Sequence, residues 1–377
     1  MARHRPALKR WLSFCMVALL AAAVACSDAS TRPATGNTSA RRPVDLSAQW
    51  VLTPPTAEDV DSAQLRAAMQ QAARVDGLAS LLVVRHGHLI AERYFGRETR
   101  DSLHSVRSDT KSVISLLVGI ALQRGILHST SQTLSEFFHP PLPVPDSAEG
   151  AITIQDLLTM SGGFRWKEET DVSEFSNWVT ARDQIAYLFA RPLVSPPGKE
   201  FNYNSAAVHL LSVILNETAP GGTNVFADSV LFAPLGIHIH AWAFDSRGIP
   251  NGGAGLWLRP RDMAKIGQLV LQNGMSGDST VVAPSWIHES TSRQITTREG
   301  LGTLGSVQYG DLWWLGSAAG HDVIYAWGYG GQYIVIVPDL DLVVVTTAAW
   351  QGLGQANHPH EQGIMDLIVS GVIPAVH

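Results

Sequence analysis

The chain has 377 residues, of which 45% are hydrophobic and 16% charged, and its net charge is −6. This hydrophobic share is typical of a folded globular protein and excludes an intrinsically disordered one. The acidic balance argues against a nucleic-acid-binding protein, which usually carries an excess of Lys and Arg. The two cysteines are Cys15 and Cys26, so the body of the chain has neither a disulfide framework nor a cysteine zinc site. The length predicts roughly two or three domains or subdomains.

Residues 1–25 have the pattern of a secretory signal peptide. Four basic residues lie within residues 1–10, and an apolar run too short for a membrane span follows from Trp11 to Ala25. The run ends in small residues directly before Cys26, which resembles a bacterial lipoprotein box, although Ala23 stands where Leu is usual. We expect cleavage before Cys26 and lipidation of Cys26, with plain secretion as the alternative. Cleavage would change the net charge from −6 to about −10.

Residues 26–45 are rich in Ser, Thr, Ala and Pro and are predicted to form a flexible tether. The mature protein would then be a membrane-anchored lipoprotein facing the periplasm, or otherwise a periplasmic or secreted protein. Its contact with a membrane would be limited to the lipid anchor.

Strand patterns lie at both ends of residues 46–377, which we interpret as one domain. Residues 78–84 and 89–95 predict a hairpin, and residues 323–327, 333–337 and 342–348 predict strands, the last two as a second hairpin. Helices are predicted over 57–75, 112–122, 157–160, 183–189, 206–215, 261–271, 285–289 and 361–373. We therefore expect an α+β fold, in which an antiparallel sheet from both termini is flanked by helices and a mainly helical region is inserted at about 126–290.

The chain lacks the common nucleophile and phosphate-binding motifs, such as Gly-x-Ser-x-Gly and the P-loop. It does contain Ser108-Asp109-Thr110-Lys111, directly before the predicted helix 112–122. Ser and Lys three residues apart share one face of a helix. Burial near the positive helix end would lower the pKa of Lys111, so that its amine could take the proton of Ser108. The motif therefore predicts a Ser108 nucleophile with a Lys111 base.

Two further stretches contain residues that are candidates for a catalytic role. Tyr203 precedes a predicted helix, and a Tyr whose pKa is depressed by a nearby Lys can shuttle protons between nucleophile and leaving group; packing at a loop–helix junction is the alternative. Tyr329, Gly330 and Gly331 lead into a strand, where glycines permit close approach of another molecule. The amide of Gln332 could then act with that of Ser108 as an oxyanion donor; a β-bulge or glycine turn is the alternative.

Together these motifs resemble the penicillin-recognising serine hydrolases. The similarity is greatest to the class C β-lactamase-like branch that includes carboxylesterases and 6-aminohexanoate-dimer hydrolase. Ser108 and Lys111 match the family's Ser-x-x-Lys, Tyr203 opens its second motif, and Tyr329-Gly330-Gly331 matches its third. The resemblance implies a β-lactamase/transpeptidase-like fold and a two-step acyl transfer that needs no metal or organic cofactor.

The chain departs from the penicillin-binding pattern at two positions. The second motif ends in Ser205 instead of Asn, and the third opens with Tyr329 instead of Lys. A main partner for a substrate carboxylate is therefore missing, which favours an uncharged or differently charged small ester or amide as substrate. A D-stereospecific peptidase or β-lactam hydrolase, and a non-catalytic binding or sensor domain, are the alternatives.

Several other residues have weaker assignments. Trp327 is predicted to wall the substrate pocket, whereas Trp166, Trp178 and Trp313 suit core packing equally well. Asp156 and Asp262 are interpreted as helix caps or ion-pair partners. The stretch around His358 and His360 lacks the spacing of a metal site and is interpreted as a solvated loop.

Overall fold

The computed structural model describes residues 41–297, 300–352 and 357–377. The predicted signal peptide, Cys26 and most of the tether lie outside the described residues. The end of the predicted tether is part of the folded domain, because the amide of Val44 donates to Gln272 and the side chain of Arg42 pairs with Asp278. None of the helices in the described part of the chain has the length and hydropathy needed to cross a membrane.

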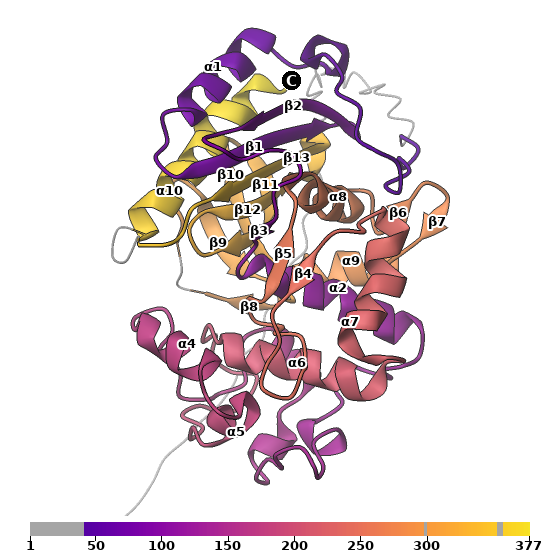
Figure 1. The fold of residues 1–377 in the computed structure, drawn as a ribbon, viewed down its shortest axis with the longest axis vertical. Coiled ribbons are helices and arrows are strands. Elements are labelled where there is room, and N and C mark those ends of the chain that lie inside the picture. Colours follow the sequence, from indigo (N-terminus) through magenta and orange to yellow (C-terminus); the bar gives the residue numbers. More distant parts are fainter. Residues whose placement is uncertain (1–40, 298–299, 353–356) are drawn as a thin grey trace, which may run out of the picture. The chain divides into compact units, whose positions relative to one another are not determined.

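The described residues form ten α-helices and thirteen strands (Figure 1). The helices are α1 Ser62–Ala72, α2 Asp109–Gln123, α3 Ile154–Leu158, α4 Val172–Val179, α5 Gln184–Phe189, α6 Ser205–Thr218, α7 Gly222–Ala227, α8 Pro260–Leu271, α9 Pro284–Ser290 and α10 Asn357–Leu367. The strands are β1 Leu78–Arg85, β2 His88–Tyr94, β3 His104–Ser105, β4 Ala241–Trp242, β5 Leu256–Leu258, β6 Met275–Ser276, β7 Ser279–Thr280, β8 Ile295–Thr296, β9 Gly305–Tyr309, β10 Trp314–Ala318, β11 His321–Gly328, β12 Gln332–Val337 and β13 Leu342–Ala348.

The main sheet has eight strands in the order β2-β1-β13-β12-β11-β10-β9-β8, and its described pairs are antiparallel. The predicted hairpins β1–β2 and β12–β13 are both present. β1 pairs with β13, so the N-terminal and C-terminal strands lie side by side, which confirms the predicted sheet from both termini. The sequence did not predict β8, β9 and β10. β8 has only two residues, and β9 and β10 contain Gly305 and Gly316, a residue type with weak β-propensity.

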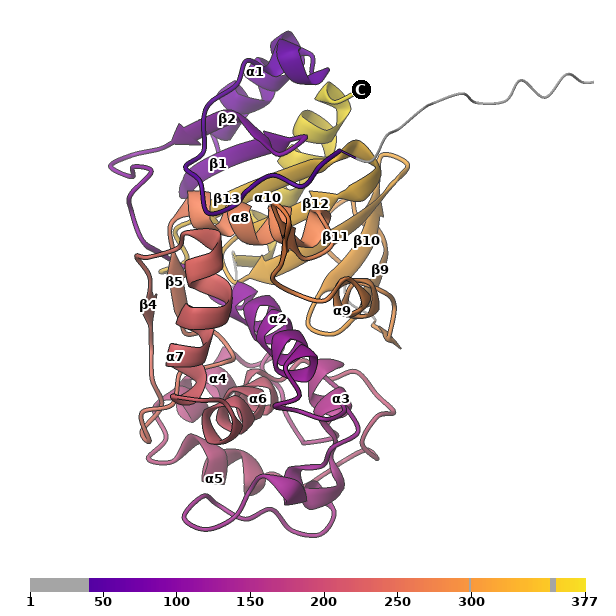
Figure 2. The same cartoon turned by 90° about the vertical axis from the view of Figure 1, so that its right-hand side faces the viewer.

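Helices cover both faces of this sheet (Figures 1 and 2). α1 and α10 pack together on one face. α8 packs on the other face against β1, β12 and β13, and Gly267 permits this close approach because a Cβ there would lie 2.6 Å from a methyl carbon of Val343. α8 lies within the predicted insertion 126–290 but belongs to the sheet layer.

α2 lies between the sheet and the mainly helical part of the molecule (Figure 2). It contacts β11 and β12 on one side and α6 on the other. Every residue from Asp109 to Ala121 is buried, as expected of a helix that is apolar around most of its circumference. The start of α2 therefore lies at the junction of the two parts, where residues from both can meet.

Candidate active site

Ser108 is the residue directly before α2. The amide of Val106 donates to the carbonyl of Leu256 in β5 at 3.0 Å, which fixes the approach to the helix. α2 begins at Asp109, so Lys111 lies in its first turn. The Lys111 Nζ is 2.9 Å from the Ser108 Oγ. The structure therefore brings the predicted nucleophile and base into hydrogen-bond contact.

Lys111 is buried, with 2% of its surface exposed. Its Nζ donates to the Ser205 Oγ at 2.8 Å and to the Gly253 carbonyl at 2.5 Å. Burial lowers the pKa of Lys111 to about 7, and the positive charge of Arg107 acts in the same direction, while Glu168 raises it. A substantial fraction of the amine is therefore neutral near pH 7, as a general base requires.

Glu168 joins this group through Ser205. The Ser205 Oγ donates to the Glu168 Oε1 at 2.6 Å, and the Ser205 amide donates to the Oε2 at 2.9 Å. The indole of Trp166 also donates to the Oε2, at 2.9 Å. A continuous chain of hydrogen bonds thus runs from Ser108 through Lys111 and Ser205 to Glu168. The sequence did not reveal Glu168, because it lies in a loop without any motif; Ser205 appeared only as a departure from the second motif.

The Gly253 carbonyl is held by its own loop. The Asn251 Oδ1 accepts from the amides of Gly253 and Ala254 at 2.9 and 3.1 Å. The Gly252 amide donates to the His209 Nδ1 at 3.3 Å. A side chain at Gly253 would place its Cβ 2.6 Å from the Ser205 carbonyl oxygen, so only glycine fits this contact with α6.

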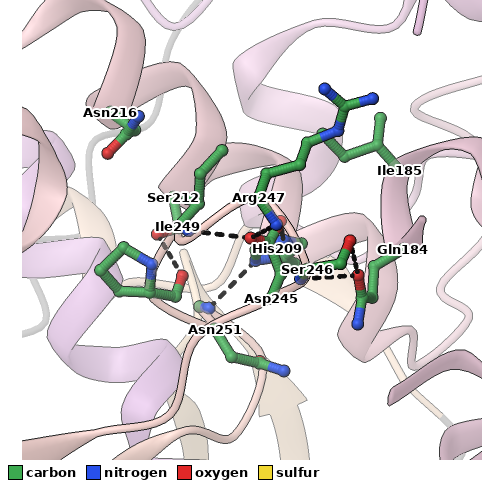
Figure 3. A network of polar contacts seen from close by, with 12 residues as sticks. Gln184, Ile185, His209, Ser212, Asn216, Asp245, Ser246, Arg247, Ile249 and Asn251 are labelled. Carbon is green, nitrogen blue, oxygen red and sulfur yellow. Dashed lines mark hydrogen bonds and ion pairs between the residues drawn. The ribbon is translucent and has the colours of Figure 1, made fainter. Parts of the chain in front are cut away.

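A buried polar network connects the loop that contains Gly253 to α6 (Figure 3). His209 pairs with Asp245 at 3.1 Å, and both side chains are 1% exposed. The Ser212 Oγ donates to the carbonyl of Pro250 at 2.7 Å. Ser205, His209 and Ser212 are spaced at four and three residues along α6 and so share one face. This face of α6 positions the loop that contacts Lys111.

Tyr203 lies on the other side of Lys111, whose Nζ is 4.7 Å from the ring centroid. Burial raises the pKa of Tyr203 well above its usual value, although a hydrogen bond with Ser108 opposes the shift. The expectation that a nearby Lys depresses this pKa is therefore wrong, because desolvation outweighs it. Tyr203 remains a protonated phenol at neutral pH and can donate a proton or a hydrogen bond.

The Ser108 side chain opens into a cavity of about 670 Å³. Its wall includes Trp327 and Tyr329 but not Gly330, Gly331 or Gln332. The Gly330 amide donates to the Glu361 Oε1 at 2.7 Å, and burial raises the pKa of Glu361 to about 7. The Gln332 side chain donates to the carbonyl of Ala348 at 2.8 Å and accepts from its amide at 3.0 Å.

The other tryptophans and aspartates considered in the sequence lie mostly outside the cavity. Trp166, Trp178 and Trp313 are buried in the core rather than on the cavity wall. Asp156 caps α3 through Thr153, and Asp262 pairs with Arg259, so both have the structural roles expected of them.

The stretch around His358 was expected to be a solvated loop; His358 is exposed as expected, but the prediction of a loop is wrong. Described residues from Asn357 onward form α10, and His358 lines the cavity beside Trp327, with ring centroids 6.3 Å apart. Arg107 and Glu169 also line the cavity and were not predicted.

Comparison with known proteins decides the family. The family model described as Beta-lactamase matches residues 63–366. The chain belongs to the Beta-lactamase family. It is 27% identical over 321 residues to 6-aminohexanoate-dimer hydrolase of Paenarthrobacter ureafaciens, covering 79% of each chain. It is 30% identical over 211 residues to Esterase EstB of Burkholderia gladioli, covering 48% of this chain and 53% of that one. This Beta-lactamase-family chain is a hydrolase.

Solved structures agree on the fold. The octameric penicillin-binding protein homologue from Pyrococcus abyssi superposes with a TM-score of 0.64 at 19% identity, covering 82% of this chain and 78% of that one. The penicillin binding protein from Bacillus halodurans superposes with a TM-score of 0.63 at 15% identity, covering 81% and 99%. At these identities the likeness concerns the fold, and it confirms the predicted β-lactamase/transpeptidase-like architecture.

Proposed function

We propose that this hydrolase cleaves an ester or amide bond through an acyl-enzyme intermediate on Ser108. The observation that carries the proposal is the contact of 2.9 Å between the Ser108 hydroxyl and a buried Lys111 amine whose pKa is about 7. A nucleophile within hydrogen-bond reach of a base that is neutral at working pH is the arrangement that nucleophilic catalysis requires. A non-catalytic binding domain would need no such amine.

In the first half-reaction, neutral Lys111 takes the proton of Ser108 while the Ser108 Oγ attacks the carbonyl carbon. The carbonyl π electrons move to its oxygen, and a tetrahedral intermediate forms. Its collapse re-forms the carbonyl and breaks the bond to the alcohol or amine, which takes the proton held by the Lys111 ammonium, either directly or relayed through the Tyr203 phenol, so that Lys111 is neutral again. The acyl group then remains on Ser108.

In the second half-reaction, water replaces the leaving group. Its proton passes to the neutral amine of Lys111 or, through it, toward the Ser205–Glu168 pair, and its oxygen attacks the acyl carbon. Collapse releases the acid while the Lys111 ammonium returns its proton to Ser108, which leaves the amine neutral for the next turnover. The carboxylate of Glu168 stabilises the transient Lys111 ammonium, since it raises the pKa of that amine.

The oxyanion of both intermediates needs two main-chain donors. We assign the first to the amide of Ser108. For the second, the sequence predicts Gln332, but the cavity wall holds Tyr329 instead. β11 ends close to the nucleophile, since a Cβ on Gly328 would lie 2.3 Å from the Val106 carbonyl oxygen. The amide of Tyr329, which follows Gly328 directly, is therefore the stronger candidate.

The substrate is proposed to be a small ester or amide. The names of the two curated relatives, an esterase and a hydrolase of 6-aminohexanoate dimer, support this class. A β-lactam or D-peptide hydrolase is the second candidate, supported by the penicillin-binding proteins among the fold matches. The third motif disfavours it, because Tyr329 stands in place of Lys.

The test compares Ser108→Ala with Ser112→Ala, which alters a serine on the same helix whose hydroxyl donates to Leu312 away from the cavity. With a short-chain nitrophenyl ester, Ser108→Ala should lose at least about 1,000-fold in kcat, whereas Ser112→Ala should stay close to the unmodified enzyme. If folded Ser108→Ala keeps wild-type turnover, the proposal fails. A cephalosporin and a D-Ala peptide in the same assay distinguish the second candidate.

We also propose that the enzyme is exported and anchored through a lipid on Cys26, on the strength of the sequence pattern of residues 1–26. Expression with radiolabelled palmitate tests this. Label in the unmodified protein and none in Cys26→Ala is expected, and equal labelling of both would contradict the proposal.

A further inference from the structure

Arg107 precedes the nucleophile and is not used by the mechanism above. Its guanidinium lies over three aromatic rings, with its central carbon 4.4 Å from the ring centroid of Trp350, 5.3 Å from that of Phe175 and 5.8 Å from that of Tyr329. All four residues line the Ser108 cavity. The guanidinium is thus a cation packed against an aromatic wall inside the proposed active site.

The hydrogen-bonding groups of this guanidinium are unused within the described part of the chain. The Arg107 Nε is buried without a partner, and neither a hydrogen bond nor an ion pair joins the side chain to another described residue. A guanidinium carries five donors in a planar fork, and buried donors are normally satisfied. Three aromatic rings surround the guanidinium carbon, and its N–H donors remain available to an acceptor that enters the cavity.

The backbone of Arg107 is strained. Its φ is +52°, in the left-handed region that a residue other than glycine rarely adopts. Two contacts hold this conformation: the Arg107 carbonyl accepts from the Thr110 amide at 3.1 Å and from the Thr110 hydroxyl at 2.6 Å. Such strain concentrates at functional sites, and here it accompanies a side chain that lies in the cavity.

Carboxylates share this cavity, but they already have protein partners. Glu168 accepts from Ser205 and Trp166, and Glu361 accepts from the Gly330 amide. Glu169 and His358 also line the wall. Arg107 differs from Glu168 and Glu361 in having a charge without a direct ion-pair or hydrogen-bond partner among the described residues.

We propose that Arg107 binds a carboxylate carried by the substrate, next to the bond that is cleaved. This inference rests on the proposed function and narrows its substrate class to acidic esters or amides. It also revises the expectation drawn from the third motif, because the cation missing at Tyr329 is supplied from the residue before the nucleophile. A guanidinium suits this task since its fork matches the two oxygens of a carboxylate.

The experiment measures a ratio of two kcat/KM values for matched substrates. One pair differs on the acyl side: nitrophenyl hydrogen glutarate against nitrophenyl butyrate. A second pair differs on the leaving-group side: 4-butyryloxybenzoate against its neutral methyl ester. The ratio is needed because Arg107 also lowers the pKa of Lys111, so its removal alters absolute rates for every substrate.

In Arg107→Gln, the acidic-to-neutral ratio should fall about 10- to 100-fold for at least one pair, as expected for loss of a charge-assisted hydrogen bond. Arg107→Lys should restore part of that loss. Arg182→Gln, which removes an exposed arginine away from the cavity wall, should leave both ratios within about twofold of the unmodified enzyme.

Unchanged ratios for both pairs in Arg107→Gln would overturn the proposal. Failure of the proposed function is a separate outcome, since it would appear as activity retained by Ser108→Ala on all four substrates. A loss of rate that is equal for acidic and neutral members would also overturn it, because a purely structural role of Arg107 predicts such a loss.

Discussion

The hydrogen-bond chain from Lys111 to Glu168 predicts how the pH dependence of catalysis responds to Glu168→Gln. The substitution removes a negative charge that stabilises the Lys111 ammonium and raises its pKa. Without that charge the amine releases its proton at lower pH. The rising limb of the pH–rate profile, which follows the neutral amine, should therefore move toward acid.

The magnitude follows from the geometry. The bonds from Lys111 to Ser205 and from Ser205 to Glu168 measure 2.8 and 2.6 Å, so the two charges are no more than about 5.4 Å apart. At an effective dielectric constant of about 20, this distance gives about 3 kcal/mol of attraction, or about 2 pKa units. The limb should move from about pH 7 in the unmodified enzyme to about pH 5.

The assay is kcat/KM for a neutral nitrophenyl ester between about pH 4.5 and 9, since this parameter reports groups of the free enzyme. Glu169→Gln is the control, because it neutralises a neighbouring carboxylate on the same cavity wall that is not among the groups acting on Lys111. Its limb should move much less. A limb that stays in place in Glu168→Gln, or moves toward alkali, would refute the reasoning.

Three other substitutions test neighbouring contacts. Ser205→Ala breaks the link between Lys111 and Glu168, and should lower kcat/KM for the same ester about 10- to 100-fold; a change below about twofold would contradict this. Asp109 is buried without a hydrogen-bond partner among the described residues, and burial raises its pKa well above the usual value. The folded state therefore favours the protonated carboxyl, and the resulting stability is present at low pH and lost as pH rises through the folded pKa. In Asp109→Asn the Tm should fall less between pH 5 and pH 8 than in the unmodified enzyme, and an equal fall would count against the assignment. Gly253→Ala places a Cβ 2.6 Å from the Ser205 carbonyl oxygen, and should lower both ester turnover and Tm, the latter by a few degrees. Gly363→Ala, whose Cβ would meet no atom of the described residues within 4 Å, should leave turnover unchanged; equal turnover in the two variants would contradict the role of Gly253.

The sequence predicted the parts of this fold that have strong local patterns. β1, β12 and β13 are largely apolar runs, and β2 follows β1 directly across a turn. The positions of these strands at the two ends of the chain implied their pairing. β9 and β10 lack such a pattern, since Gly305 and Ser306 lie in β9 and Gly316 and Ser317 lie in β10. Their place in the sheet depends on neighbouring strands, which no local sequence window contains.

The candidate site likewise contains residues that local sequence patterns predicted and residues that they did not. Ser108 and Lys111 were predictable because both lie on one helical turn, where sequence spacing equals spatial spacing. Glu168 and Gly253 reach Lys111 from loops distant in the sequence. The pKa of Tyr203 was wrongly predicted, because the sequence contains the nearby Lys but not the burial that outweighs it.

The acyl-enzyme itself can be observed by mass spectrometry of the protein mixed rapidly with a nitrophenyl ester and quenched in acid. The account predicts one acyl group per chain, located on the peptide that contains Ser108, with a matching burst of nitrophenol. Ser108→Ala should show neither. An acyl group on another residue, or steady turnover without any adduct on Ser108 under conditions that trap the intermediate, would contradict it.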